Sequence, residues 1–470
     1  MKNAWNKYDV NMENDCEYFC REYMDFLSDC KSERECVSWI AQDARRHGYR
    51  DLDELIRSGE PLRAGDKVYR QNMGKSMVLY HIGKDPLEAG MNILGAHIDS
   101  PRIDIKPNPL YENSGFAYFD THYYGGIKKY QWVTIPLAIH GVAVKKDGMR
   151  VLISIGERDG DPVFFISDLL VHLSSEQLTK TAAKVIEGEA LDIVAGSRPL
   201  QIPKKEGEKE SEGEEAIKKG ILKILKKRYD IEEGDLMSAE LEAVPAGRAR
   251  EAGLDQSMIL GYGHDDRVCA YTSYRALLDA EDISRTACLI LADKEEIGNV
   301  GATGMESRFF ENTTAEVMEL SCGFHELKLR RCLANSCMLS NDVSSTFDPL
   351  YGDCFDKRNA AYFGGGLAIA KYSGAGGKGG ANDANAEYLA KLRGILDDAG
   401  VSYQMAEFGR VDLGGGGTIS YILSLYGMEV VDCGVPVLNM HAPWEAVSKA
   451  DVFEALRGYR AFLENCRKAV

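Results

Sequence analysis

The sequence predicts an α/β protein into which a β-rich domain is inserted. Several apolar runs, of which 286–292 is the clearest, have the length and composition of strands buried on both faces. They end in polar residues, and helical patterns accompany them in residues 1–105 and 250–470. Between 106 and 249 the pattern changes to a series of β-rich runs. Because 470 residues are too many for one ordinary core, we expect two domains, with 106–249 as the insert.

The composition is that of a soluble globular protein, with 44% hydrophobic and 27% charged residues. A formal net charge of −17 argues against nucleic acids and anionic membranes as main partners. Residues 1–7 lack the apolar core of a signal peptide, and no apolar run is long enough to span a bilayer. We therefore expect a cytoplasmic protein. The twelve cysteines contain no Cys-x-x-Cys pair, which favours buried apolar side chains over a zinc knuckle.

The first 83 residues contain elements that build the fold and carry no visible chemistry. Helical spacing of apolar residues predicts packing helices between residues 13 and 48. The runs 66–70 and 76–83 predict the two strands of a hairpin. His81 lies within the second run and follows its strand alternation, so we expect a structural role for it.

The next strand delivers the first candidate site residues. The apolar run from residue 91 ends in His97 and Asp99, and Pro101 stops the strand. A His-x-Asp spacing puts both side chains on one side of an extended segment. There the imidazole can bind a metal while the carboxylate fixes its tautomer from behind. The alternative is a satisfied pair on the surface.

The insert is expected to be β-rich and to serve contacts between subunits. Runs 132–144 and 151–156 have strand composition. The Lys, Glu and Gly tract at 203–215 cannot bury a core and is predicted to be a loop. A helix with a basic outer face is predicted at 216–229, and we read that face as solvated.

The second α/β part supplies carboxylates and another histidine at predicted strand ends. Asp265 follows the strand-like run from residue 258 and precedes a helix expected at 270–280, where it could bridge two cations or cap the helix. Glu295 and Glu296 follow the run 286–292; alone, such a pair is more often a solvated turn. Two further predicted strands end in Asp342 and His441. Glycine-rich runs at 364–366, 374–380 and 414–417 favour tight turns near a substrate backbone over a phosphate loop.

These residues together predict a dinuclear metal site. The proposed ligands are two histidines and three carboxylates, a set that holds a pair of borderline divalent cations if one carboxylate bridges them: His97, Asp265, Glu296, Asp342 and His441. Glu295 is then free to act as the general base. Two metals about 3.5–4 Å apart would activate a water and polarise a carbonyl, while Glu295 moves the proton to the leaving amine.

The segments GAHIDSPR (95–102), HDDR (264–267), DKEEIG (293–298), SNDV (340–343) and MHA (440–442) occur in an order that resembles the aspartyl aminopeptidase family of dinuclear zinc exopeptidases. The resemblance covers nearly the whole chain. It implies a mixed-sheet α/β/α catalytic domain with an inserted β-rich dimerisation domain, and a dodecamer built from dimers. It also implies that His97, Asp265 and Asp342 hold one Zn²⁺ and that Asp265, Glu296 and His441 hold the other. Glu295 would be the base, with Asp99 behind His97.

The resemblance extends to two further residues and has two departures. In the family a histidine from the neighbouring subunit helps to stabilise the tetrahedral intermediate, and His172 is the matching position; from the sequence alone a core or surface histidine is the alternative. Family members favour an acidic N-terminal residue, for which Lys378 is a candidate cation, although a flexible loop lysine is the alternative. QWVTIP (131–136) only weakly echoes the Trp-x-x-Trp-Phe-Asp-Arg signature of the insert, and GTISY (417–421) replaces Gly-Thr-Ile-Gly-Pro. These departures affect the intersubunit contacts and the substrate pocket.

We therefore predict a cytoplasmic metallo-aminopeptidase that acts on peptides, with two Zn²⁺ per subunit and a preference for Asp or Glu as a further expectation. Mn²⁺ or Co²⁺ would suit the same ligands. A related dinuclear-zinc deacylase or carboxypeptidase would use the same metals on a different end of its substrate. A non-catalytic assembly protein that keeps a structural metal is the alternative from another class, and the presence of Glu295 argues against it.

Overall fold

The computed structural model describes residues 3–200 and 215–467, which form two compact units. The first, here called the α/β unit, comprises Met1–Ser100, Ala249–Met440 and Trp444–Val470. The second, the β unit, comprises Pro101–Arg248 and His441–Pro443. Of the loop predicted at 203–215, residues 203–214 lie outside the described residues. No helix among the described residues is long and apolar enough to cross a membrane, and the cytoplasmic location stays a prediction.

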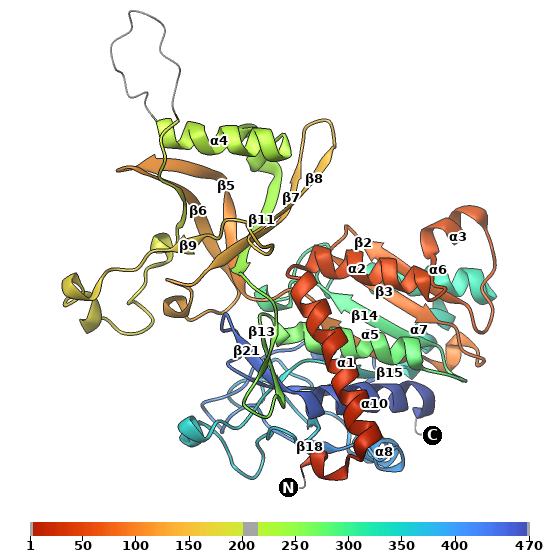
Figure 1. Cartoon of the computed structure of the whole chain (residues 1–470). Helices are drawn as coiled ribbons and strands as arrows, with labels where there is room; N and C mark the ends of the chain where they lie inside the picture. Colours follow the sequence, from red (N-terminus) through yellow and green to blue (C-terminus); the bar gives the residue numbers. More distant parts are fainter. Residues whose placement is uncertain (1–2, 201–214, 468–470) are drawn as a thin grey trace, which may run out of the picture. The chain divides into compact units, whose positions relative to one another are not determined.

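A nine-stranded mixed sheet forms the centre of the α/β unit (Figure 1). Strands β14, β4, β15 and β19 are parallel neighbours in that order, and β3 pairs with β14 in the antiparallel direction. Their apolar sequences agree with burial on both faces, which parallel strands require. In spatial order the strands are β1 Arg50–Asp51, β2 Lys67–Asn72, β3 Ser76–His81, β14 Ala287–Ala292, β4 Asn92–His97, β15 Cys337–Ser340, β19 Glu429–Gly434, β17 Leu367–Ala370 and β18 Tyr403–Met405.

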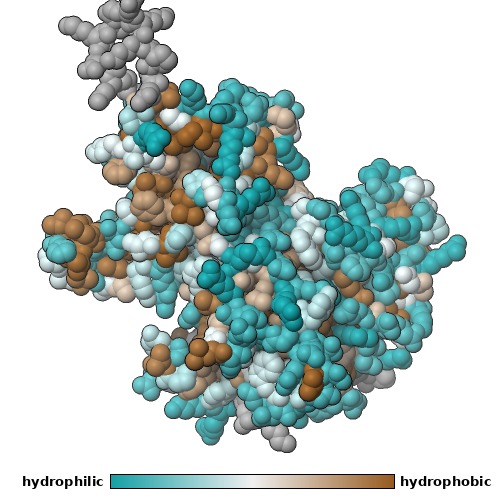
Figure 2. Space-filling model, viewed as in Figure 1, coloured by the Kyte–Doolittle hydropathy of each residue, from teal (hydrophilic) through white to brown (hydrophobic). Residues whose placement is uncertain are grey.

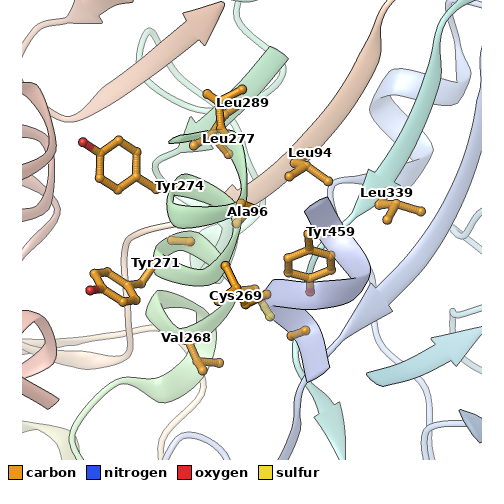
Figure 3. Packing of buried hydrophobic residues seen from close by; sticks show 14 of the residues in the cluster. Leu94, Ala96, Val268, Cys269, Tyr271, Tyr274, Leu277, Leu289, Leu339 and Tyr459 are labelled. Carbon is orange, nitrogen blue, oxygen red and sulfur yellow. The ribbon is translucent and has the colours of Figure 1, made fainter. Parts of the chain in front are cut away.

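Helices cover both faces of this sheet and create two apolar cores. Successive strand residues point to opposite faces, so Leu289 belongs to one core and Ile290 to the other. Figure 3 shows side chains of α5 and α10 packed near Leu94 and Leu339 in the first core. That core is covered by α1 Val10–Asp29, α2 Glu33–Arg46, α5 His264–Asp279, α8 Ala386–Asp398 and α10 Lys449–Asn465. The second is covered by α3 Leu52–Ser58, α6 Phe309–Cys322, α7 Glu326–Asn335 and α9 Ser420–Ser424. The predicted α/β class is confirmed.

The α/β unit also contains a second, five-stranded sheet, and one of its strands corrects a prediction. Its strands, in spatial order, are β12 Arg250–Ala252, β13 Met258–Gly261, β21 Glu445–Ser448, β20 Pro436–Leu438 and β16 Ser344–Ser345. The strand before Asp265 is therefore β13 of this small sheet. The strand predicted to end at His441 ends at Leu438, because Asn439 and His441 have φ angles of 60° and 65°, which interrupt a strand.

Antiparallel pairing builds the seven-stranded sheet of the β unit. The helix predicted at 216–229 is present as α4 Ala216–Tyr229 and packs on β5, β6 and β10. The run predicted as strand from 132 becomes strand only at Leu137, because Thr134 has a φ of 62° and Pro136 has no N–H for a ladder. The strands, in spatial order, are β8 Arg150–Ile155, β7 Leu137–Val144, β11 Ala239–Pro245, β5 Arg102–Asn113, β6 Phe116–Tyr124, β10 Ile193–Gly196 and β9 Phe165–Ile166.

The smaller sequence predictions also have structural outcomes. The helices expected between 13 and 48 are α1 and α2, and the hairpin is β2 with β3. Ten of the twelve cysteines are buried and all are free thiols, as the absence of paired motifs indicated. The helix expected from 270 begins at His264, after Gly263 as the N-cap residue. Asp265 and Asp266 have non-helical backbone angles, so the regular part of this helix starts after them, and a capping role for Asp265 stays a prediction.

Candidate metal centre

The sheet topology brings four predicted site residues to one edge of the α/β unit. His97 is the last residue of β4, and Asp342 lies two residues after β15. Glu295 and Glu296 begin the short 3₁₀ helix Glu295–Ile297 that follows β14. Because β14, β4 and β15 are parallel neighbours, their carboxyl ends meet at this edge. Ligand sites in open α/β sheets lie outside the carboxyl ends of strands.

His97 is oriented so that one ring nitrogen faces a group of carboxylates. Its Nδ1 lies 2.9 Å from the carbonyl oxygen of Asp99 and 3.4 Å from the carboxylate Oδ1 of the same residue. With the ring proton on Nδ1, Nε2 carries the lone pair that a metal requires. Nε2 lies 3.2 Å from Asp265 Oδ1, and 4.0 Å from both Asp342 Oδ1 and Glu295 Oε2.

Asp99 fixes the turn that carries the two glutamates. Its Oδ1 accepts a hydrogen bond from the backbone N–H of Glu295 at 3.2 Å, and its Oδ2 accepts one from Glu296 at 3.3 Å. Asp99 is buried, so its carboxylate depends on these donors for compensation. One carboxylate therefore sets the positions of both glutamates relative to the His97 ring.

Hydrogen bonds to the backbone of Asp265 fix the position of this residue at the start of α5. Its N–H donates to Glu445 Oε2 at 3.0 Å, and its carbonyl oxygen accepts from Ser100 Oγ at 2.7 Å. The preceding turn is closed by the fully buried Arg267, which donates to the carbonyl oxygen of Gly263 at 3.0 Å. Gly263 has a φ of 72°, and a Cβ there would lie 1.6 Å from Arg267 Nη2. A larger residue would displace the guanidinium and, with it, the turn before Asp265.

The electrostatics of this edge indicate a need for cations. Burial raises the pKa of Asp342 well above its ordinary value, and the charges of Asp266 and Glu295 raise it further. Burial alone would lower the pKa of His97, but hydrogen bonds to Asp265 and Asp99 and nearby carboxylates raise it well above normal. Burial also raises the pKa of Asp266, whose Oδ2 accepts a hydrogen bond from the backbone N–H of His97 at 3.3 Å. Carboxylates crowded around one imidazole favour divalent cations as compensation.

The donor set fits zinc or a similar borderline metal. Ligand atoms of His97, Asp265 and Asp342 all lie within 4.8 Å of one another, and the same holds for His97 with Glu295 and Glu296. Imidazole nitrogen and carboxylate oxygen are ordinary ligands of Zn²⁺.

The remaining predicted site residues belong to other segments of the chain. His441 belongs to the segment His441–Pro443, which groups with the β unit, and its Nδ1 lies 2.8 Å from the carbonyl oxygen of Gly126. His172 is exposed in the 3₁₀ helix Val171–Leu173 of the β unit. Lys378 has its Nζ 3.3 Å from Asp383 Oδ2 and 3.5 Å from the centroid of the Tyr372 ring, so its charge already has partners.

Two supporting residues were not predicted from the sequence. Glu445 is buried in β21 and receives the Asp265 N–H, and Ser100 donates to the Asp265 carbonyl. A carboxylate directly before the apolar residues Ala446 and Val447 is a signal that could have identified Glu445. Nothing in the local sequence distinguishes Ser100 from any serine before a proline.

Comparisons with known proteins identify similar sequences and structures. The model of a family described as aminopeptidase I zinc metalloprotease (M18) matches residues 26–463. A probable M18 family aminopeptidase 1 of Clostridium acetobutylicum is 56% identical over 464 residues, which cover 99% of this chain and 98% of that protein. The crystal structure of an M18 aminopeptidase from Thermotoga maritima has a TM-score of 0.92, 42% identity and 99% coverage of both chains. A yeast structure, the S. cerevisiae mApe1 dodecamer, shares the fold with a TM-score of 0.75 and 20% identity, covering 96% of this chain and 97% of that one.

Proposed function

The chain belongs to the M18 family of zinc metalloproteases and is an aminopeptidase, and from this premise we propose how its residues carry out the reaction. The observation that carries the proposal is the edge formed by β14, β4 and β15, where carboxylates surround one imidazole nitrogen. Burying these carboxylates without a cation would cost free energy, because their charges would be uncompensated. With a bound divalent cation, the same group suits hydrolysis.

His97, Asp265 and Asp342 are proposed to bind one Zn²⁺, and Asp265, Glu296 and His441 to bind a second. The first set is supported by the 3.2 Å and 4.0 Å separations of His97 Nε2 from the two aspartates. The second is supported by its chemistry, because His441 would add a neutral imidazole to two carboxylates. Asp265 is the shared ligand, and its backbone is held on both sides. Mn²⁺ and Co²⁺ would accept the same ligands.

Zinc bound here would polarise the scissile carbonyl and lower the pKa of an attacking water. Glu295 accepts the proton of that water and returns it to the leaving amine. Asp99 holds the Glu295 backbone, so the base stays beside His97 during both transfers. The Nδ1–H of His97 remains bonded to the Asp99 carbonyl oxygen, which keeps Nε2 available as a ligand.

The test is release of a chromogenic group from aminoacyl substrates carrying Asp, Glu, Leu or Lys, with and without a chelator. Release that stops with chelator and returns with Zn²⁺ is expected. N-acylated amino acids and peptides with a blocked N-terminus form the control panel, because a deacylase or carboxypeptidase would accept them. Turnover of the blocked substrates alone would contradict the proposed reaction.

We further propose that the β unit joins copies of this chain into a homo-oligomer, as in the dodecameric yeast structure. Apolar side chains are exposed around His172, including Val171 at 73% and Leu173 at 66% exposure. Figure 2 shows hydrophobic side chains gathered over parts of this unit. An exposed apolar group of this kind is typical of a protein interface. His172 would then reach the active site of a neighbouring copy, as the family resemblance implies.

Light scattering and kinetics test this assembly separately from the chemistry. Val171→Asp with Leu173→Asp should reduce the molar mass measured by light scattering. His172→Phe should leave the mass unchanged and lower kcat. If His172→Phe retained full kcat in an intact oligomer, the histidine would have no part in the reaction.

A further inference from the structure

Asp432 is a buried carboxylate that the proposed reaction leaves without a role. It lies in β19, with Ser340 opposite it in β15 and Ala370 opposite it in β17. Three hydroxyls donate to its carboxylate: Thr418 Oγ1 at 2.7 Å, Ser420 Oγ at 3.1 Å and Ser373 Oγ at 3.1 Å. Burial raises the pKa of Asp432, and these hydroxyls offset part of the rise because they stabilise the ionised form.

The three donors come from two glycine-rich loops that contact each other. Ser373 belongs to the loop between β17 and α8, whereas Thr418 and Ser420 flank the start of α9. The N–H of Gly374 donates to the carbonyl oxygen of Gly416 at 2.8 Å. Gly415 has a φ of 123°, and a Cβ there would lie 2.0 Å from the Gly374 carbonyl oxygen. The loops can approach this closely because Gly415 has no Cβ. Asp432 binds one hydroxyl of the first loop and two of the second.

The segment that Asp432 binds lies beside the candidate metal centre. Ser340, opposite Asp432, precedes Asp342 by two residues. A Cβ at Gly95, two residues before His97, would lie 3.1 Å from Ile419 Cδ1, so Ile419 packs against β4. The charge of Glu295 is also among the causes that raise the pKa of Tyr421, after burial and the bond to Glu306. Residues 418–421 therefore lie near the carboxyl ends of β4 and β15.

The backbone next to this segment is open to a ligand. Gly416 and Gly417 are exposed, and a Cβ at either position would meet no atom within 4 Å. Exposed glycine backbone next to a catalytic edge can pair with the backbone of a bound peptide. Thr418 follows these two glycines directly in the chain, and the Gly416 carbonyl oxygen already accepts the Gly374 N–H.

We propose that Asp432 is a positioning residue, which holds Thr418, Ser420 and Ser373 so that the backbone of 416–418 receives the peptide substrate. This inference rests on the proposed reaction. It assigns the carboxylate a function in substrate binding that loop stability alone would not require. Its effect should therefore be found in KM, because neither a proton acceptor nor a proposed metal ligand is changed.

Single hydroxyl substitutions test the proposal with little risk of unfolding. Thr418→Val keeps the shape of the side chain and removes the donor, whereas Thr418→Ser keeps the donor. We expect KM to rise about tenfold in Thr418→Val, the effect of one hydrogen bond to a charged group, and to stay near wild type in Thr418→Ser. Asp432→Asn should raise KM at least as much, with kcat and zinc content largely retained.

Two matched controls separate positioning from stability. Thr314→Val removes a buried hydroxyl that donates to the Phe310 carbonyl oxygen in α6. Asp451→Asn changes a buried carboxylate that accepts the N–H groups of Gly364 and Gly366 at 2.9 and 2.7 Å. Both are expected to change the unfolding temperature and to leave KM unchanged.

The outcomes are distinguishable. A wild-type protein that releases no aminoacyl group would contradict the proposed reaction and leave the positioning role without a substrate. An active wild type whose KM is the same in Thr418→Val, Asp432→Asn and the controls would overturn the positioning role alone. A KM that rises equally in Thr418→Ser and Thr418→Val would also overturn it, because the hydroxyl would then be irrelevant.

Discussion

Replacing Asp99 by Asn tests how the turn with Glu295 and Glu296 is held. The carboxylate accepts two backbone N–H groups at 3.2 and 3.3 Å and lies 3.4 Å from His97 Nδ1. An amide keeps one acceptor and turns an NH₂ group toward one of the two backbone donors. One hydrogen bond to a charged group is therefore lost, and the remaining one is weakened by the loss of charge.

The expected size of the effect follows from these distances. A hydrogen bond to a charged group contributes about 1.5–3 kcal/mol, and separations of 3.2–3.3 Å lie at the long end of the usual range, so the lower value applies. About 1.4 kcal/mol corresponds to a factor of ten in an equilibrium constant. Substitution of residues behind metal ligands typically weakens metal binding about 10–100-fold. We therefore expect Asp99→Asn to bind Zn²⁺ about tenfold more weakly.

Zinc affinity would be measured by competition with a chromogenic chelator, together with thermal unfolding of the metal-free protein. Asp451→Asn is the matched control, because it makes the same chemical change at a buried carboxylate that accepts two backbone N–H groups elsewhere. An unchanged zinc affinity in Asp99→Asn would refute the reasoning. Equal weakening in both variants would show a general loss of stability instead of a defect at the site.

Four further outcomes are expected. Glu295→Gln should lower kcat about 10²–10⁴-fold with zinc content unchanged, as measured by elemental analysis; loss of metal there, but not in Glu296→Gln, would mean that the two roles are exchanged. Removing zinc with a chelator should lower the unfolding temperature measured by calorimetry, because zinc bound to the folded state at about 1,000 times its Kd contributes about 4 kcal/mol. Burial lowers the pKa of His81 from 6.5 to about 4. The contribution of His81 to stability is therefore present above pH 6.5 and is lost as the pH falls toward 4. In denaturant titrations, the free energy of unfolding of His81→Gln should fall less over this pH range than that of the wild type. Lys378→Ala should raise the KM for Asp and Glu substrates relative to the KM for Leu substrates. An unchanged ratio of these KM values would show that Lys378 interacts with Asp383 and Tyr372 and does not bind the substrate.

The central strands could be predicted because their signal is local. The run 286–292 is apolar without interruption, and β14 occupies Ala287–Ala292, buried on both faces. The polar residues after such runs point to the carboxyl edge of a sheet, which is where His97 and Glu295 meet. The helix 216–229 could also be predicted from the sequence, because its apolar spacing extends over 14 residues.

Predictions failed where long-range pairing or backbone conformation decides. Nothing local shows that β13 pairs with β21, 180 residues or more along the chain, and so joins a second sheet. The conformation of Asn439, with a φ of 60°, ends the strand before His441 but cannot be read from an apolar pattern. Glu445 supports Asp265 only because the two segments meet in the folded unit. The ligand roles, the second zinc ion and the part played by His172 stay predictions.

The β unit has a property that bears on how such proteins diversify. Its first strand, β5, and its last, β11, are direct antiparallel neighbours, with Ile103 opposite Ala243 and Asp104 opposite Glu242. The chain therefore enters and leaves this module at adjacent points, and a bridge of a few residues could replace everything between them. Gain, loss or exchange of the whole module would leave the order of the surrounding strands unaltered, so quaternary architecture could evolve without a change in the hydrolytic machinery.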